Sequence, residues 1–350
     1  MSIYQSVVRP VLFKLSADRS HEIGRTALRW SFPWRVASAV CGLSQTYPEL
    51  RTTFAGVALN SPVGLAAGFD KDGDLIEALS CLGFGFVSVG SIMPEPRYGN
   101  PFPRIVRWPE REAILDSMGV PSKGRAYAIE RLKARRHRSV PVFANVGGFT
   151  SDTLADGVLA VRPYADAVEI SLMCPNVLAA GERFDELAML RGVLARVSNG
   201  RGSLIVRVPN DTTSSHERFA ELVEICVAAG IGGLKVGGGY ATSEPRLGSG
   251  RGTVHGRVIF ERALENVERA ASFAKGRIPI KGNGGISSAE DVLAMRRAGA
   301  VCVDLYSAFI YRGVTIAHDI NRDLAKALSG EAWSSAASPA TVTRSMADVA

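Results

Sequence analysis

The feature that most constrains the fold is a repeated alternation between short apolar runs and helical patterns, beginning near residue 60. Near-continuous apolar strands separated by helices are typical of a parallel sheet covered on its outer face. Eight such units predict an α/β fold, a (β/α)8 TIM barrel. The eight runs are residues 63–67, 86–90, 142–146, 167–171, 204–208, 233–236, 279–282 and 302–305, and helical patterns between them include 71–82, 215–229 and 289–298.

A doubly wound open sheet is the alternative arrangement of the same units. Its dinucleotide-binding form carries a G-x-G-x-x-G turn with an acidic residue about twenty positions later. The sequence has no such combination. The barrel is therefore the favoured architecture.

The chain divides into three parts by pattern. Residues 1–45 predict an N-terminal extension of two short amphipathic helices, 46–328 the barrel, and the Ala- and Ser-rich residues 329–350 a flexible tail. The extension either caps the barrel or forms a hydrophobic entrance and membrane contact. Its apolar stripe comprises Tyr4, Val7, Val8, Val11 and Leu12, followed by Ile23, Ala27, Leu28 and Trp30.

Composition limits the cellular setting and the partners. The net charge is +7, but the densest basic cluster, residues 135–138, is more typical of a solvated helix end than of a nucleic-acid site. Five cysteines without a CxxC pair argue for a reducing compartment and against zinc. No run has the length of a membrane span or the pattern of a secretory signal. A cytoplasmic protein with a small-molecule substrate is expected.

Chemistry is expected where strands end, because a (β/α)8 barrel presents its catalytic groups on its C-terminal face. Cys174 follows the run 167–171 and stands between Met173 and Pro175. We expect this thiol to transfer a proton. Lys71, Asn145 and Arg207 also stand at strand ends and suit a cofactor that accepts the hydride.

The last two strand ends predict a phosphate site. The run 281–286 is KGNGGI, and Ser307 follows the eighth strand. Loops after strands seven and eight commonly bind phosphate in such barrels, through exposed backbone N–H groups. The alternative is that these glycines are ordinary turns.

These motifs together resemble the dihydroorotate dehydrogenase family, and in particular its quinone-linked, membrane-associated class. The resemblance runs from about residue 4 to residue 328. It implies FMN as cofactor, a quinone as acceptor reached through the N-terminal helices, and a peripheral position on the inner face of the membrane. The motifs on which the resemblance rests are 64–73 (GLAAGFDKDG), 99–104 (GNPFPR), 174–176 (CPN), 282–286 (GNGGI), 306–307 (YS), 8–13 (VRPVLF) and His21 with Glu22.

The resemblance also implies a role for each matching residue. Lys71 would face both flavin and substrate, Asn145 would bond the isoalloxazine, and Arg207 replaces a lysine near the flavin N1/O2 edge. Further residues implied at FMN are Ala67, Gly68, Ser91, Ser171, Gly237, Gly256, Gly284, Gly285, Tyr306 and Ser307, and those implied at the substrate are Asp116, Met118, Gly119, Asn176, Gly238 and Gly239.

Cys174 stands at the catalytic base of the family. The quinone class normally has serine there, and the soluble class has cysteine. A thiol titrates nearer neutrality than a hydroxyl. Base function is therefore expected to survive the replacement.

The substrate pocket departs from the family pattern. Asp116, Ser171 and Gly238 stand where the family holds the orotate ring with asparagines, and only Asn176 remains. Each lost hydrogen bond removes about 0.5–3 kcal/mol, so three would weaken binding by roughly two to five decades. An ionised Asp116 would repel a carboxylate unless it is protonated or paired, for example with Arg104 or Arg107.

A changed substrate is therefore expected, bulkier than dihydroorotate and less anionic or partly cationic. The reaction is the dehydrogenation, or reverse reduction, of a C–C bond next to a carbonyl. One alternative is a genuine quinone-linked dihydroorotate dehydrogenase of pyrimidine biosynthesis. Another is a flavin-binding protein without catalysis. A structural role is expected for His255, rather than contact with substrate or phosphate.

Overall fold

A computed structural model describes residues 3–135, 140–172, 185–209, 216–329 and 331–333. Its centre is a closed barrel of eight parallel strands, so the predicted (β/α)8 architecture is confirmed. Each predicted apolar run overlaps one barrel strand. Around the barrel the strands are β3 (Val63–Asp70), β4 (Phe86–Ile92), β7 (Val142–Val146), β8 (Ala167–Ser171), β9 (Leu204–Arg207), β10 (Gly233–Gly237), β13 (Ile280–Asn283) and β14 (Ala300–Leu305).

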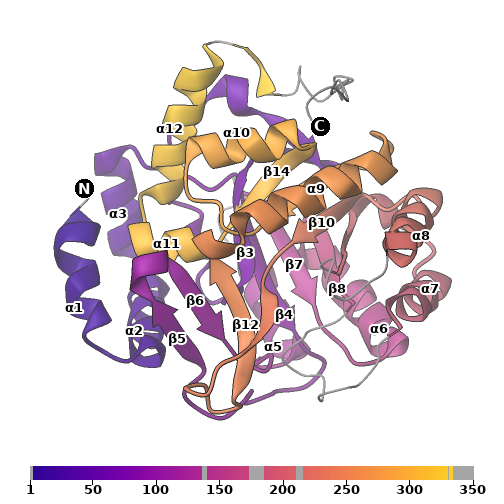
Figure 1. Ribbon diagram of the computed structural model, residues 1–350, viewed down its shortest axis with the longest axis horizontal. Coiled ribbons are helices and arrows are strands. Elements are labelled where there is room, and N and C mark those ends of the chain that lie inside the picture. The colour runs from indigo at the N-terminus through magenta and orange to yellow at the C-terminus, as the bar shows by residue number, and fades with distance from the viewer. Residues whose placement is uncertain (1–2, 136–139, 173–184, 210–215, 330, 334–350) are drawn as a thin grey trace, which may run out of the picture.

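Helices surround the barrel on its outer face (Figure 1). The helix after β3, α4 (Ile76–Leu79), is shorter than the predicted helix 71–82. The Asp70 carboxylate accepts hydrogen bonds from the backbone N–H groups of Gly73, Asp74 and Leu75, so residues 71–75 form a turn instead of the first part of the helix. The helices are α4 (Ile76–Leu79), α5 (Arg125–Lys133), α6 (Ser151–Val161), α7 (Glu186–Arg196), α8 (His216–Ala228), α9 (Phe260–Ala274), α10 (Ala289–Arg297), α11 (Ser307–Arg312) and α12 (Ile316–Leu328), with short 3-10 turns η2 (Pro48–Leu50), η3 (Pro109–Arg111), η4 (Arg162–Tyr164), η5 (Arg201–Ser203) and η6 (Arg257–Ile259).

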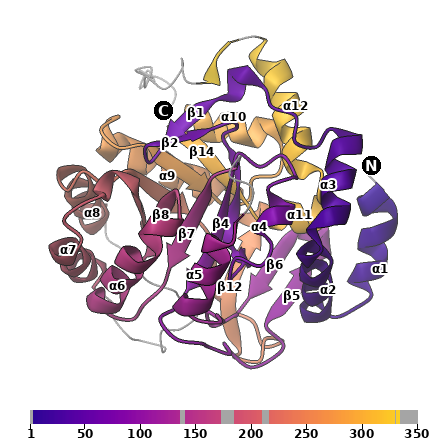
Figure 2. The ribbon, with the colours of Figure 1, turned by 180° about the vertical axis from the view of Figure 1, so that it is seen from behind.

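The N-terminal extension contains one helix more than predicted. A first helix consists of η1 (Tyr4–Val8) and α1 (Arg9–Phe13), and α2 (Ala17–Arg29) follows, capped by the Ser16 side chain. A further helix, α3 (Ser31–Cys41), begins directly after Trp30. Pro33 lies in its first turn, where a helix tolerates proline, so this residue does not break the helix. Both views place the three helices on the opposite side of the molecule from α7 and α8 (Figures 1 and 2).

Two small sheets, which the sequence reading missed, occupy the two ends of the barrel. The hairpin β1 (Thr52–Phe54) and β2 (Val57–Leu59) brings Phe54 against Phe143, and Phe143 stacks on Phe86 with ring centroids 4.8 Å apart. At the other end, loops after β4 and β10 form a four-stranded antiparallel sheet. Its order is β11 (Tyr240–Ser243), β12 (Arg251–Gly256), β6 (Ala113–Asp116) and β5 (Ile105–Trp108).

The described residues of the C-terminal tail contact the barrel. Trp333 is buried, and its indole N–H donates to the carbonyl of Val301 on β14 at 2.8 Å. The Arg296 guanidinium lies over the indole ring at 4.6 Å. Across the part of the chain that the structure describes, none of the helices is long and apolar enough to cross a bilayer.

Asp74 joins the N-terminal extension to the barrel. Its side chain is 6% exposed; the Tyr127 hydroxyl donates to Oδ1 at 2.7 Å, and the Lys123 ammonium to Oδ2 at 2.8 Å. The guanidinium groups of Arg29, at the end of α2, and Arg131 lie 3.5 and 3.4 Å away. Burial raises the pKa of Asp74, but these hydrogen bonds and cations outweigh it, and the pKa is lowered overall.

We therefore expect D74N to lower the free energy of unfolding by about 1–3 kcal/mol at pH 7. Since the carboxylate contributes only when ionised, the loss should shrink as the pH falls below about 4. Urea unfolding monitors both effects. The matched control D152N removes a carboxylate that is 75% exposed and pairs with Arg196 at 3.3 Å; it should cost less than about 0.5 kcal/mol. Equal losses in both variants would contradict this role for Asp74.

Candidate active site

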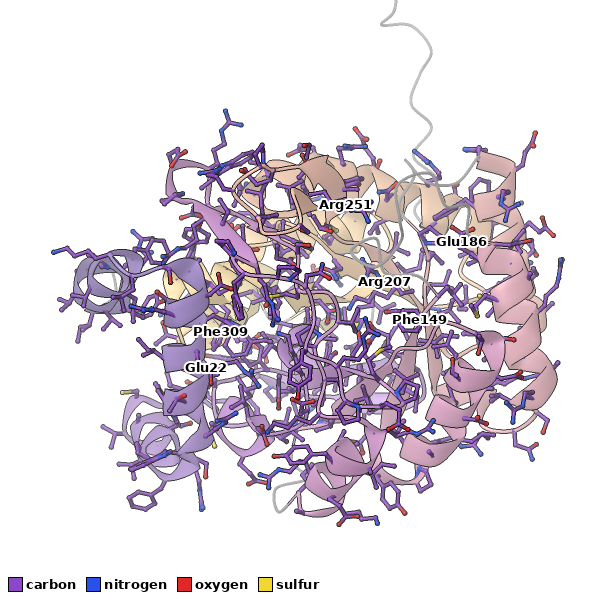
Figure 3. All side chains as sticks on the ribbon, turned by 90° about the horizontal axis from the view of Figure 1, so that it is seen from below. Glu22, Phe149, Glu186, Arg207, Arg251 and Phe309 are labelled. Atoms are coloured by element: carbon purple, nitrogen blue, oxygen red, sulfur yellow. The ribbon has the colours of Figure 1, made fainter. Side chains whose placement is uncertain are left out.

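The strand ends of the barrel open into one cavity that collects most of the predicted site residues. Its walls come from β3, β4, β7, β8, β9 and β10, and the antiparallel sheet adds Asp116, Thr253 and His255. In Figure 3, Arg207 lies between the N-terminal helices, marked by Glu22, and α7, marked by Glu186. The predicted residues on the cavity wall are Ala67, Gly68, Lys71, Ser91, Asp116, Met118, Asn145, Ser171, Arg207, Gly238, Gly239 and Tyr306.

An adjoining hollow contains the predicted phosphate-binding residues Gly256, Gly284, Gly285, Tyr306 and Ser307. Gly284 and Gly285 have φ values of +133° and +70°, which favour glycine. A Cβ on Gly285 would also lie 2.9 Å from the Gly256 carbonyl oxygen. The loops after β12 and β13 thus approach each other closely, and Ser307, just after the end of β14, lines the same hollow. This arrangement suits a phosphate bound by backbone N–H groups.

Two of the predicted residues lie off the cavity wall and two lie outside the described residues. Gly119 and Gly237 do not line the cavity. Both glycines allow close backbone approach next to the cavity. A Cβ on Gly119 would lie 2.3 Å from Asn100 Oδ1, and a Cβ on Gly237 would lie 2.0 Å from the Asn283 carbonyl oxygen. Cys174 and Asn176 belong to residues 173–184, which the structure does not describe.

The amide of Asn145 has a defined orientation. Its Nδ2 donates to Glu169 Oε1 at 2.8 Å and to Ser171 Oγ at 3.1 Å, and its Oδ1 accepts from the Ser91 hydroxyl at 2.6 Å. A carboxylate can only accept hydrogen bonds. The amide therefore cannot rotate by 180° without losing the bond to Glu169.

Beneath this amide lies a set of four buried charges that the sequence reading missed. Lys235 and Lys281 each lie within hydrogen-bond or ion-pair distance of both Glu169 and Asp304, and all four side chains are at most 4% exposed. We call these residues the charged ring. The available signal was a single charged residue within each of four otherwise uncharged strands.

Asp116 pairs with His255 rather than with either predicted arginine. Asp116 Oδ2 lies 2.9 Å from His255 Nε2. Burial raises the pKa of Asp116, but the attraction and hydrogen bond of His255 outweigh it, and the pKa is lowered. The predicted partners are engaged elsewhere: Arg104 Nε donates to the Asn100 carbonyl, and Arg107 donates to the Leu15 carbonyl. His255 also lines both hollows.

Lys71 is a buried cation on the same cavity wall as this pair, and its charge attracts Asp116. Its ammonium donates to the Gly68 carbonyl at 2.5 Å, and the residue is 6% exposed. Burial and the neighbouring Arg25 lower the pKa of Lys71 from 10.5 to about 8, although Asp116 and other carboxylates oppose the shift.

A second cavity of about 520 Å³ lies between α2 and the active-site mouth. It shares Lys71, Met118 and Pro121 with the first and is lined on the helix side by His21 and Arg25. Burial, with Lys71 and Arg25 nearby, holds the pKa of His21 well below its usual value. The extension thus forms one wall of a chamber that leads to the strand ends.

Comparisons with known proteins agree with this geometry. The family profile described as "Dihydroorotate dehydrogenase" matches residues 49–328. A dihydroorotate dehydrogenase (quinone) of Methylococcus capsulatus is 34% identical over 92% of this chain and 99% of its own length, and one of Deinococcus deserti is 34% identical over 93% and 96%. A crystal structure of an Eimeria tenella dihydroorotate dehydrogenase in complex with ferulenol has a TM-score of 0.75 at 26% identity, covering 88% of this chain and 91% of that one.

The lowered pKa of Lys71 predicts a pH-dependent stability. An unfolded lysine titrates near 10.5 and the folded one near 8, so between these values the folded protein binds fewer protons and its stability rises with pH. K71M removes the cost of burying the cation. It should be more stable than the wild type at pH 7 by about 1–3 kcal/mol, and this gain should shrink from pH 8 to 10.

Urea unfolding at several pH values measures this gain. The control K326M removes a lysine whose side chain is 72% exposed and should keep the wild-type pH dependence. A K71M protein that is less stable than the wild type at pH 7 would show that the Lys71 cation stabilises the fold.

Proposed function

The chain belongs to the dihydroorotate dehydrogenase family, and from this premise we propose that it is an FMN-dependent oxidoreductase whose substrate differs from dihydroorotate. It acts on CH–CH groups, dehydrogenating a C–C bond next to a carbonyl or reducing it in the reverse direction. The observation that carries the changed substrate is the Asp116–His255 pair in the pocket, 2.9 Å apart.

The shape and polarity of the cavity suit FMN. A flat ring needs backbone close to its face; Gly68 and Gly90 lie in this wall, and a Cβ on Gly90 would meet the Asn145 carbonyl oxygen at 2.2 Å. Asn145 and Arg207 would bond the ring, and the glycine loops with Ser307 would hold the phosphate. When bound, FMN accepts the hydride.

Proton transfer is assigned to Cys174. The family's catalytic base falls at this position, directly after β8, whose last residue Ser171 lines the cavity. The thiolate would remove a proton from the carbon next to the carbonyl. Lys71, on the cavity wall, would keep a positive charge near the carbonyl oxygen below pH 8.

The pocket favours a less anionic and bulkier substrate. Ionised Asp116 replaces an uncharged amide and is held by His255. A carboxylate can only accept hydrogen bonds, so the N–H donor that an amide would offer to a substrate carboxylate is lost. Gly238 leaves space where the family has an asparagine, and its φ of +121° is one that other residues rarely adopt. An added Cβ there would lie 2.9 Å from Arg207 Nη2. A substrate with a neutral or basic group facing Asp116 fits these features.

The electron acceptor is assigned to the quinone class, as the names of the relatives suggest. The second cavity between α2 and the mouth supports a route for it. Peripheral membrane contact through residues 1–45 is supported by the apolar side chains that the extension exposes, among them Val11, Trp30, Phe32 and Val40 at 60–81%. Residues 46–328 would then form the FMN-binding barrel, and the predicted flexible tail is corrected at Trp333, which packs on β14.

A genuine dihydroorotate dehydrogenase is the second candidate, favoured by the names of relatives that cover 92% or more of this chain. Purified FMN-loaded protein with dihydroorotate and a soluble quinone separates the two. We expect little turnover. Turnover at the efficiency usual for the family would establish this second candidate instead.

Restoring two of the family's amides should restore orotate binding. We expect D116N/S171N to lower the Kd for orotate about 10- to 100-fold relative to the wild type, since each regained hydrogen bond contributes about 0.5–1.5 kcal/mol. Flavin absorbance changes report the binding. The control E290Q, which neutralises an exposed carboxylate on α10, should leave the Kd unchanged. An unchanged Kd in D116N/S171N would refute the assignment of these positions.

Replacing the thiol of Cys174 by a hydroxyl should move the pH profile of flavin reduction. A free thiol titrates near 8.5, and a serine hydroxyl far higher. With any substrate that turns over, C174S should be slower at pH 7 by at least about tenfold and should continue to gain rate above pH 9, whereas the wild type levels off. Stopped-flow bleaching of the flavin measures both profiles. Superimposable profiles would exclude Cys174 as the base.

A further inference from the structure

The charged ring is a closed alternation of two acids and two lysines inside the barrel. Lys235 Nζ lies 2.9 Å from both Glu169 Oε1 and Asp304 Oδ2. Lys281 Nζ lies 2.8 Å from Glu169 Oε2 and 3.2 Å from Asp304 Oδ2. The four residues come from β8, β10, β13 and β14, so the ring spans the interior of the barrel.

Stability alone gives a weak reason for such a ring. Removing four charges from water is costly, and well-packed apolar side chains of similar volume are often as stabilising as a buried ion pair. The layer below is packed in that way, because Phe143 contacts both Phe54 and Phe86. The Lys281 ammonium lies 5.1 and 5.4 Å from the ring centroids of Phe86 and Phe143. The barrel therefore changes from an aromatic layer to a charged layer on approaching the mouth.

The two lysines differ in what else they reach. Lys235 and Glu169 line the cofactor cavity, and Lys281 does not. Lys235 also lies in register with Arg207 on the neighbouring strand β9. Lys235 donates a hydrogen bond to Glu169 Oε1 and lies within ion-pair distance of Asp304 Oδ2. An ammonium has three N–H groups, so beside these two carboxylates Lys235 has a further donor for a group bound in the cavity that it lines.

Glu169 links the ring to the amide described above. Its Oε1 accepts both the Lys235 ammonium at 2.9 Å and the Asn145 Nδ2 at 2.8 Å. Burial raises the pKa of Glu169, but Lys235 and Lys281 outweigh it and hold the pKa well below the usual range. The Glu169 carboxylate thus stays ionised and keeps the Nδ2 group of Asn145 directed as a donor toward the charged ring.

We propose that Lys235 is a cofactor-contacting residue, held by the charged ring so that its third N–H donates to an acceptor atom of the bound flavin. Glu169 is then a positioning residue, acting through Asn145. The inference rests on FMN binding at this cavity. Together with Arg207, Lys235 places positive charge at the floor of the site, which stabilises the negative charge that reduction brings to a flavin.

The test compares two charge-balanced double variants. K235M/D304N leaves the Glu169–Lys281 pair, and K281M/D304N leaves the Glu169–Lys235 pair. Each removes one lysine and one carboxylate from the same ring, so both retain a neutral interior and should fold to similar stability. They differ only in whether an ammonium faces the cofactor cavity.

Quenching of flavin fluorescence measures the Kd for FMN, and sulfite titration of the bound flavin reports positive charge beside it. We expect K235M/D304N to raise the FMN Kd and the sulfite Kd by at least about tenfold each, and K281M/D304N to change them less than about threefold. The rescue variant K235R should recover most of the sulfite affinity. Equal effects in the two double variants would overturn the role of Lys235, whereas a wild type that binds no FMN would instead overturn the proposed function.

If either double variant unfolds, E169Q provides an independent measurement. It retains both lysines but can present an amide N–H to Asn145, which allows the Asn145 amide to rotate. We expect a changed flavin absorption spectrum and a raised FMN Kd without loss of secondary structure. A spectrum and Kd identical to those of the wild type would contradict the positioning role of Glu169.

Discussion

Closure of the barrel by pairing between its last and first strands is the constraint on which the rest of the structure depends. β14 pairs with β3 through Val303 and Val63, and this contact joins residues more than two hundred positions apart. Because all eight strands are parallel, closure brings their C-terminal ends to one mouth. Lys71, Asn145 and Arg207 can then line a single cavity although they are distant in sequence.

The interior of the barrel has two layers with opposite character. At the N-terminal end, Phe54, Phe86 and Phe143 pack on one another and close the barrel. Above them, the charged ring replaces apolar packing and connects through Glu169 to Asn145 at the cavity. A low-dielectric floor beneath fixed charges strengthens their effect on a bound ring system, because little water can reorient there.

The antiparallel sheet above the mouth gives this family member its particular pocket. β6 and β12 pair with Asp116 opposite Thr253, and Asp116 meets His255 near the same wall. The N-terminal helices add a second chamber lined by His21 and Arg25. The barrel thus supplies the floor of the first cavity, the antiparallel sheet adds to its wall, and the N-terminal helices line the second cavity.

Local sequence determined the eight strands and the identities of most cavity residues, since apolar periodicity and strand-end chemistry depend on near neighbours. It also indicated that Asp116 needed a partner. Tertiary structure alone decided that this partner is His255, because pairing of β6 with β12 depends on two loops over a hundred residues apart. The same holds for the charged ring: each of its residues is a single charge in an apolar strand, and only barrel closure brings the four within contact distance.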